Sequence, residues 1–211
     1  MFKQLRLLAP VTTFGLCLAV SPLMAEPDDP DDSVTFNLVV SAGATACLPH
    51  ASGAVKIKSV GSVEIMEVSV KGLPPHTAFD LFVIQVPKAP FGISWYQGDI
   101  QTDKNGSGHE RFIGRFSIET FAVAAGSAPA PAVFNGPFPN ATLNPSFNPI
   151  QMYHLGLWFD SPQAAQTAGC SPTVTPFNGE HNAGIQVLNT SSFPDDHGPL
   201  RALNPSVKKT K

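Results

Sequence analysis

The stretch VEIMEVSVKGLPPHTAFDLFVIQV, residues 63–86, contains two apolar strand patterns separated by a turn. In the first pattern the apolar positions change phase between Ile65 and Met66, which indicates either burial on both faces or a β-bulge. Two consecutive prolines cannot donate to a strand ladder, so residues 72–77 form a turn. Residues 79–86 are apolar at nearly every position, which predicts a central strand covered on both faces.

Similar strand patterns continue on both sides of this stretch. Alternating or apolar runs that predict strands occur at residues 33–41, 55–60, 151–159 and 184–190. One short helix is expected with Pro162 in its first turn, Asp160 or Ser161 as its cap and Gly169 at its end. Many short strands with one small helix predict an all-β, antiparallel β-sandwich of the immunoglobulin-like kind, and the alternative is a β-barrel.

A hairpin is predicted from residues 95–102 and 109–117, joined by Asp103-Lys104-Asn105-Gly106. The sequence favours a type I turn closed by a left-handed Gly106, with Asp103 accepting hydrogen bonds from its own turn. In that register Asp99 lies opposite Arg111 as a cross-strand charge pair. A two-residue type I′ loop would shift the pairing and remove this contact.

The first 25 residues have the pattern of a secretory signal peptide. Two basic residues, Lys3 and Arg6, precede a short apolar run, and the small residue Ala25 is followed by an acidic segment. We therefore expect cleavage after Ala25 and a secreted or periplasmic protein. Residues 26–33 are expected to be a disordered acidic N-terminus.

Signal cleavage would leave two cysteines, Cys47 and Cys170, which are expected to form one intramolecular disulfide in an oxidising compartment. Residues 34–203 are predicted to be a single β-sandwich domain, and residues 204–211 a flexible basic tail. Within this domain, residues 124–150 form a long proline-rich connection without periodicity, which is either a surface loop packed by its own phenylalanines or a mobile segment.

Charge and hydropathy argue against two classes of partner. The formal net charge is −3, and the only basic cluster is the tail Lys208-Lys209-Thr210-Lys211, so no nucleic-acid groove is expected. No apolar run long enough for a transmembrane helix follows the signal peptide.

A metal site is one functional hypothesis. None of the histidines stands at a His-x-His or His-x-x-x-His spacing, so a zinc or copper site would have to assemble from distant strands. The best candidates are His154, Glu180 and His181, with Glu180 as ligand or general base. The alternative is that His154 is a hydrogen-bonded core histidine in a protein without a cofactor.

An aromatic ligand surface is a second hypothesis. Phe91, Trp95 and Tyr96 lie where a Pro- and Gly-containing loop enters the hairpin, and such side chains suit the faces of sugars or peptides. The alternative is that Trp95 and Tyr96 alternate, so that one is in the core and the other is exposed.

Residues 72–116, with the turn residues 72–77 and 98–108, resemble a unit found in secreted bacterial β-sandwich proteins. Together with Asn178-Gly179-Glu180-His181-Asn182-Ala183-Gly184, the resemblance covers most of residues 34–201. It implies the fold and carries over no catalytic residues.

We therefore expect a secreted, non-catalytic β-sandwich module with a binding or structural role outside the cytoplasm, whose extracellular ligand is a glycan or a protein. The alternatives are a metal-dependent enzyme that uses His154, Glu180 and His181, and a carbohydrate-binding module that uses Phe91, Trp95 and Tyr96.

Overall fold

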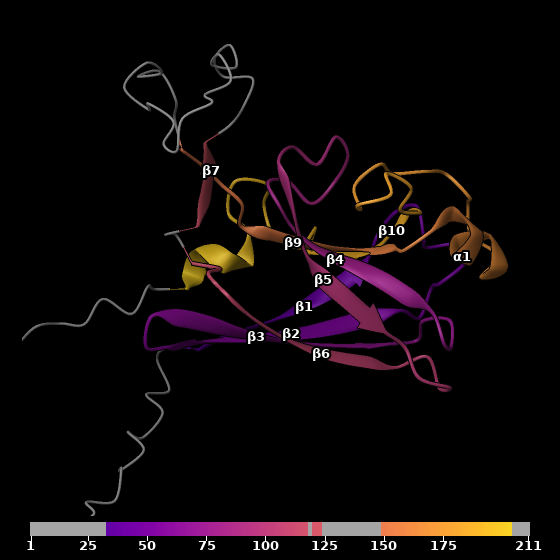
Figure 1. Ribbon diagram of the computed structural model, residues 1–211, viewed down its shortest axis with the longest axis horizontal. Helices are drawn as coiled ribbons and strands as arrows, with labels where there is room; N and C mark the ends of the chain where they lie inside the picture. Colours follow the sequence, from indigo (N-terminus) through magenta and orange to yellow (C-terminus); the bar gives the residue numbers. More distant parts are fainter. Residues whose placement is uncertain (1–32, 118–119, 124–148, 204–211) are drawn as a thin grey trace, which may run out of the picture.

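The computed structural model describes residues 33–117, 120–123 and 149–203. The predicted signal peptide, nearly all of the acidic segment after it, most of the proline-rich connection and the basic tail lie outside the described residues. The described part is all-β, with eight antiparallel strands in one nearly closed sheet, a separate pair of short strands and one short α-helix (Figure 1).

The large sheet contains, in spatial order, β5 (Ser94–Gln101), β4 (Ala78–Ile84), β9 (His154–Phe159), β10 (Gln186–Asn189), β1 (Ser33–Val40), β2 (Ser52–Val60), β3 (Val63–Lys71) and β6 (Gly108–Gly114). The remaining elements are β7 (Phe121–Val123), which pairs with β8 (Pro149–Gln151), the helix α1 (Pro162–Thr167) and the 3-10 helix η3 (Pro199–Ala202).

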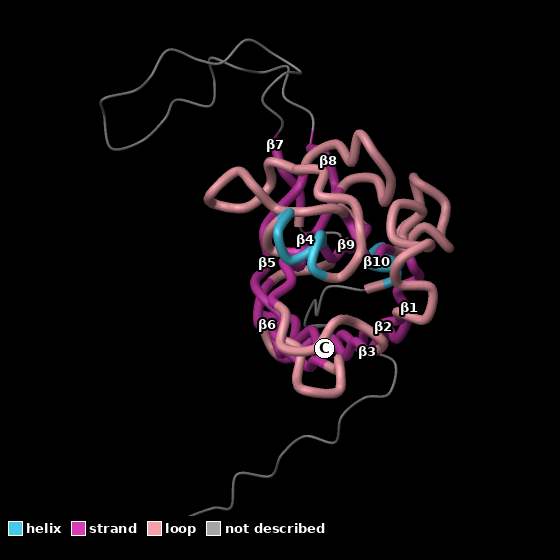
Figure 2. Tube along the Cα trace, turned by 90° about the vertical axis from the view of Figure 1, so that its right-hand side faces the viewer, coloured by secondary structure: helices cyan, strands magenta, loops and turns pink. Residues whose placement is uncertain are grey.

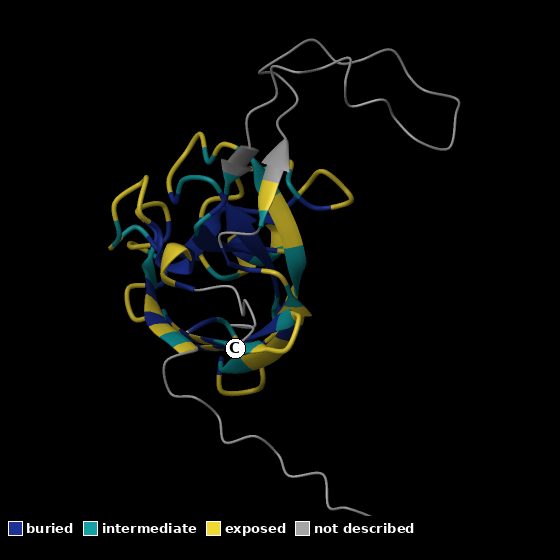
Figure 3. Ribbon diagram, turned by 90° about the vertical axis from the view of Figure 1, so that its left-hand side faces the viewer, coloured by how far each residue is buried: buried dark blue, intermediate teal, exposed yellow. Residues whose placement is uncertain are grey.

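Strand β1 joins the two halves of the large sheet. Its residues 33–38 pair with β2, and its last residues, Val39 and Val40, pair with β10. The sheet therefore bends over itself, and seen end-on the strands run around a central core (Figure 2). Buried residues dominate the β4–β9–β10 half, whereas the β2–β3–β6 half alternates between buried and exposed positions (Figure 3).

The two strands that opened the sequence argument are found where they were predicted. Ile65 and Met66 are both buried, and β3 keeps an unbroken register with β2 and β6, so the phase change reflects burial on both faces and not a bulge. Every residue from Phe79 to Ile84 in β4 is buried. A strand covered on both faces reads as a continuous apolar run because neither face meets water.

The predicted turn after Gln101 is present, but the predicted hairpin ladder is wrong. Gly106 has a φ of 71°, and Asp103 accepts backbone hydrogen bonds from Asn105 and Ser107. Strand β5 nevertheless pairs with β4, and β6 pairs with β3. The expected contact between Asp99 and Arg111 is therefore absent from the register.

The reason is a second turn packed against the first. The backbone N–H of Leu73 donates to the Gly106 carbonyl, and the N–H of His76 donates to the Asp103 carbonyl, each at 3.1 Å. The turn that follows β3 and the turn that follows β5 thus form one corner. The former connects β3 to β4, and the latter connects β5 to β6. Because β3 pairs with β6 and β4 pairs with β5, Asp99 lies opposite Asp80 and Arg111 lies opposite Glu67.

The short helix brings one cysteine to the other. The Ser161 side chain caps α1 by accepting a hydrogen bond from the N–H of Ala164, and Gly169 ends the turn with a φ of 77°. Cys170 follows directly and forms a disulfide with Cys47, which lies between β1 and β2. Among the described residues, no helix has the length and apolar character needed to cross a membrane.

Replacing both cysteines by alanine is expected to destabilise the fold. The bridge joins positions 123 residues apart, and closing a loop of that length in the unfolded chain corresponds to an upper limit of about 5 kcal/mol in the chain-entropy account. Denaturant unfolding should show this loss in the double variant and a similar loss in the reduced wild type. Equal midpoints for the oxidised wild type and the variant would contradict the argument.

A glycine pair tests the corner between the two turns. Gly106 and Gly61 both have positive φ, but an added Cβ at Gly106 overlaps the carbonyl oxygen of Leu73, whereas nothing lies within 4 Å at Gly61. Gly61→Ala should cost about 1 kcal/mol for the left-handed backbone alone. Gly106→Ala should cost more than about 2 kcal/mol in the same unfolding assay. Equal losses of stability in the two variants would mean that the two turns move apart to accommodate the Cβ without a loss of free energy.

Candidate functional site

A cleft of about 570 Å³ lies on the outer side of the β5–β4–β9 part of the sheet. It is lined by Asp80 of β4, Tyr96 and Asp99 of β5, Asp160 after β9, and the loop residues Phe177, Asn178, Gly179, Glu180 and His181. Four of these nine residues carry carboxyl groups, and His181 is the only basic residue among them. The cleft is therefore rich in hydrogen-bond acceptors.

The loop that forms one wall of the cleft is fixed to the end of β9. The Asn178 side-chain amide donates to the Asp160 carbonyl at 2.9 Å, and its oxygen accepts from the N–H of Asn182 at 2.9 Å. An antiparallel bridge between Thr175 and Ala183 closes the base of the loop. Asn178 is buried, and its side chain holds the loop in place beside Asp80.

Asp80 is the most deeply buried of the residues that line the cleft. It interrupts the apolar run of β4, it is only 1% exposed, and its Oδ2 atom has no hydrogen-bond partner. In the ladder it lies between Asp99 on one side and Trp158 on the other. A buried carboxyl oxygen without a donor is costly, so this atom is unusual for a position whose role is packing alone.

Burial, with a smaller contribution from the negative charges of Asp160 and Asp99, raises the pKa of Asp80 to about 7. The neighbouring Asn178 amide acts in the opposite direction and lowers the pKa. The groups with the largest effects on this pKa include no cation. Asp80 therefore exchanges its proton near neutral pH, where an ordinary aspartate is fully ionised.

A bulge in β5 places Tyr96 and Asp99 on the same face. The register shifts where Leu81 and Phe82 of β4 meet β5, so that Phe82 faces Tyr96 while Asp80 faces Asp99. Strict alternation would separate residues three apart onto opposite faces, and the extra residue of a bulge reverses this. The Tyr96 hydroxyl donates to Asp99 Oδ1, and burial together with the Asp99 carboxylate raises the pKa of Tyr96.

An aromatic cluster adjoins the cleft. Trp158 packs against Phe82, Phe91 and Phe177 with ring centroids 5.1–5.4 Å apart. Tyr96 contacts this cluster through Phe82 at 5.6 Å, and Phe177 also lines the cleft. This second, smaller core covers the outer face of β4, while the main core covers its inner face.

The three aromatic residues proposed from the sequence do not form one surface. Phe91 is packed into the aromatic cluster, and Tyr96 lines the cleft and is 47% exposed. Trp95 precedes Tyr96 on the strand, so its side chain projects toward the other side of the sheet, where it is 63% exposed. Only Tyr96 of the three belongs to the cleft.

The proposed metal ligands also separate into two places. Glu180 and His181 line the cleft, whereas His154 lies in β9 and is fully buried. The Nε2 atom of His154 donates to the Asp195 carbonyl at 3.1 Å, which leaves Nδ1 to accept from the Thr190 hydroxyl at 2.8 Å. Burial lowers the pKa of His154, in agreement with a neutral ring. Within the described ranges, no group of three or more His, Cys, Asp or Glu residues is arranged to hold a metal ion.

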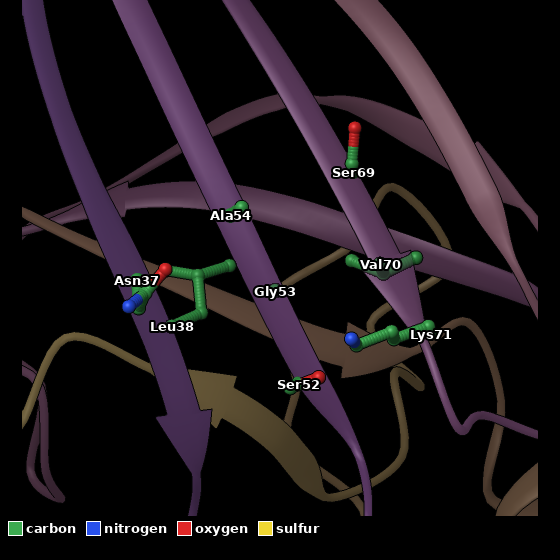
Figure 4. A pocket seen from close by; sticks show the side chains of 8 residues that line it. All are labelled: Asn37, Leu38, Ser52, Gly53, Ala54, Ser69, Val70 and Lys71. Carbon is green, nitrogen blue, oxygen red and sulfur yellow. The ribbon is translucent and has the colours of Figure 1, made fainter.

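A second concavity, of about 460 Å³, crosses β1, β2 and β3 (Figure 4). Its hollow shape comes from small side chains on neighbouring strands, chiefly Gly53, Ala54 and Ser69. None of the residues that line it has a buried polar atom without a partner. It is therefore a shallow part of a solvated sheet face and a weaker candidate than the acidic cleft.

Sequence reasoning missed the central residue of the site. The available signal was Asp80 itself. A charged residue inside the run Phe79–Ile84 is unexpected in a strand buried on both faces, because buried charges are rare where they have no partner or function. From the sequence, Asp99 is expected to pair with Arg111, and either Asp160 or Ser161 to cap the helix. In the structure Arg111 lies opposite Glu67, and Ser161 is the cap. Their convergence depends on the bulge and on the loop at residues 175–183.

Comparisons with known proteins do not assign a family. No protein-family model matches the chain, and no curated protein matches its sequence.

Asp80→Asn is expected to stabilise the fold at neutral and alkaline pH. The pKa of Asp80 is higher in the folded chain than its ordinary value of 3.8, so its contribution to stability is present below about pH 4 and is lost as the pH rises through about 7. Asparagine carries no charge to bury. The variant should match the wild type near pH 4 and exceed it at pH 8 by up to about 4 kcal/mol.

Denaturant unfolding across this pH range measures the difference. Glu110→Gln, which removes an exposed carboxylate from β6, should leave the pH dependence almost unchanged. A loss of stability in Asp80→Asn that is the same at every pH would show that the carboxyl group is not desolvated in the folded protein.

Proposed function

We propose that this protein is a secreted, non-catalytic β-sandwich module that binds an extracellular ligand in the acidic cleft. The observation that carries the proposal is Asp80, which lines the cleft and whose buried Oδ2 atom has no hydrogen-bond donor. A ligand that donates to this oxygen would supply the missing interaction. Such costly groups persist where function requires them, so the cleft is the favoured binding site.

Two further observations support the compartment and the fold in this proposal. The Cys47–Cys170 disulfide is typical of proteins in oxidising compartments, in agreement with the signal-peptide pattern of the first 25 residues. The change of partner along β1 divides the large sheet into two halves that face each other across the main core. This division favours a sandwich over a barrel.

Binding is favoured over catalysis by the way the walls are built. Asn178 has its polar atoms committed to the loop, and the Tyr96 hydroxyl is committed to Asp99. The groups available to contact a ligand are the aspartate carboxyl groups, the exposed side chains of Glu180 and His181, and the aromatic rings. Such a set positions a ligand that carries donors, as a glycan hydroxyl or a protein side chain does.

A thermal-shift screen tests the proposal without assuming the ligand. The library would contain neutral sugars, amino acids, amines, short peptides and the chlorides of zinc, copper and calcium. At a ligand concentration one hundred times Kd, binding stabilises the folded state by about 2.7 kcal/mol. For a chain of this length that corresponds to a rise in Tm of roughly 5–10 °C.

We expect at least one class of compound to raise the Tm of the wild type and of Ser69→Ala, a variant of the second concavity, but not that of Asp80→Asn. A library in which no compound distinguishes Asp80→Asn from the wild type would refute the cleft as the binding site. Turnover of a library compound that is lost in Asp80→Asn would replace the binding proposal by an enzymatic one.

A further inference from the structure

The geometry points to an organic cation, an ammonium or guanidinium group, as the chemistry that the acidic cleft recognises. This inference rests on the proposed function, because it names the ligand class of the same site. It is carried by three features of the cleft: the imbalance of its charges, the spacing of its carboxyl groups and the aromatic rings in its wall.

The charge imbalance is the first feature. Asp80, Asp99 and Asp160 gather around one end of β4, and Glu180 adds a fourth carboxyl group from the loop. No lysine or arginine lines the cleft. The carboxyl groups of Asp99 and Asp160 act on Asp80 as like charges, which is unfavourable in a partly desolvated site. A neutral ligand would satisfy hydrogen bonds but leave this repulsion, whereas a cation removes it.

The spacing of the carboxyl groups separates an organic cation from a bare metal ion. No three acidic, histidine or cysteine side chains in the described ranges converge closely enough to coordinate one ion. The acceptors are instead spread around a cleft of about 570 Å³. That is the volume of a small organic group rather than of one atom. An ammonium or guanidinium group has several N–H donors that reach separated acceptors at once.

The aromatic rings supply the third feature. Tyr96 and Phe177 both line the cleft, and both contact Phe82 at 5.5–5.6 Å, so their positions are fixed by the aromatic cluster. Aromatic faces attract ammonium and guanidinium groups through their quadrupole, and their edges pack against an alkyl chain. An alkylammonium group with its charge near Asp80 and its carbon chain along these rings therefore matches the site.

Proton release accompanies binding in this arrangement. Around Asp80, β5 contributes Asp99 and Tyr96, the end of β9 contributes Trp158 and Asp160, and the loop contributes Asn178, Glu180 and His181. His181 is the only basic side chain among them. A cation binds the ionised form of Asp80, so affinity should rise with pH. For one group with a pKa of about 7, the gain from pH 6 to pH 8 is at most about tenfold.

Isothermal titration calorimetry with matched probes tests the inference. One arm uses cadaverine and its neutral counterpart 1,5-pentanediol, which represents a free amine. The other arm uses the peptide acetyl-Gly-Lys-Gly-amide and the same peptide with the lysine side chain acetylated, which represents a basic protein segment. We expect the charged member of at least one pair to bind, its neutral partner to bind at least tenfold more weakly, and the affinity to be higher at pH 8 than at pH 6.

Three variants connect this binding to the cleft. Asp80→Asn should weaken the charged probe at least tenfold, and Tyr96→Leu, which removes a ring from the wall, should weaken it as well. Glu110 is an exposed residue of β6 and does not line the cleft. Glu110→Gln removes one negative charge there and should change the affinity by less than twofold. A similar loss in Glu110→Gln would reduce the effect to the net charge of the protein and overturn the inference.

The remaining outcomes separate the inference from the proposed function. Binding of a neutral sugar or of calcium that depends on Asp80, with no binding of either charged probe, would overturn the organic cation and leave the binding module intact. If neither these probes nor any compound of the wider library binds in a manner that depends on Asp80, both proposals fail. Binding of cadaverine without the lysine peptide would identify a free amine, and the reverse would identify a protein segment.

Discussion

A strand buried on both faces that nevertheless carries a carboxyl group is the constraint on which the rest of this structure depends. Strand β4 has the main core on its inner face and the aromatic cluster on its outer face, so no position from Phe79 to Ile84 reaches bulk water freely. Phe82 and Ile84 satisfy this constraint by packing. Asp80 does not, and its environment holds its pKa near neutrality instead. Asp80 lines the acidic cleft, so a ligand in the cleft would lie beside this group.

The bulge in β5 brings further polar and aromatic side chains to the face of the sheet on which Asp80 lies. Without it, Tyr96 and Asp99 would lie on opposite faces of an edge strand, and Asp99 alone would face Asp80. The register shift brings the phenol beside the Asp99 carboxylate, and it places one aromatic ring at the border between the acidic cleft and the aromatic cluster. A single extra residue thus joins an apolar surface to an acidic one. This is the usual role of bulges near the edges of sheets, where they redirect side chains.

Sequence reasoning located the local features well and the long-range pairing less well. The buried run of β4, the left-handed Gly106 and a helix cap at Asp160 or Ser161 are each determined by a few neighbouring residues, so composition and spacing predict them, and the structure places the cap at Ser161. The partner of β5 depends instead on how two distant turns pack together, and alternation within a strand carries no information about this. The acidic cleft was missed for the same reason, because Asp80, Asp99 and Asp160 come from three segments that only the folded sheet brings together.

Three buried ionisable residues show how a structural polar group differs from a functional one in this fold. His154 is fully buried, yet both of its ring nitrogens have hydrogen-bond partners in the chain, so it needs no ligand to satisfy them. Glu64 has an unpartnered Oε1 atom, but its Oε2 atom accepts from the N–H of Phe116 and lies 3.6 Å from Nε of Arg115, so its charge is compensated. Asp80 has neither a paired cation nor a complete set of donors, and it lines the acidic cleft. Burial by itself therefore does not mark the site. The proposed binding site rests instead on a buried carboxyl group that lines a cleft and lacks a compensating partner among the described residues.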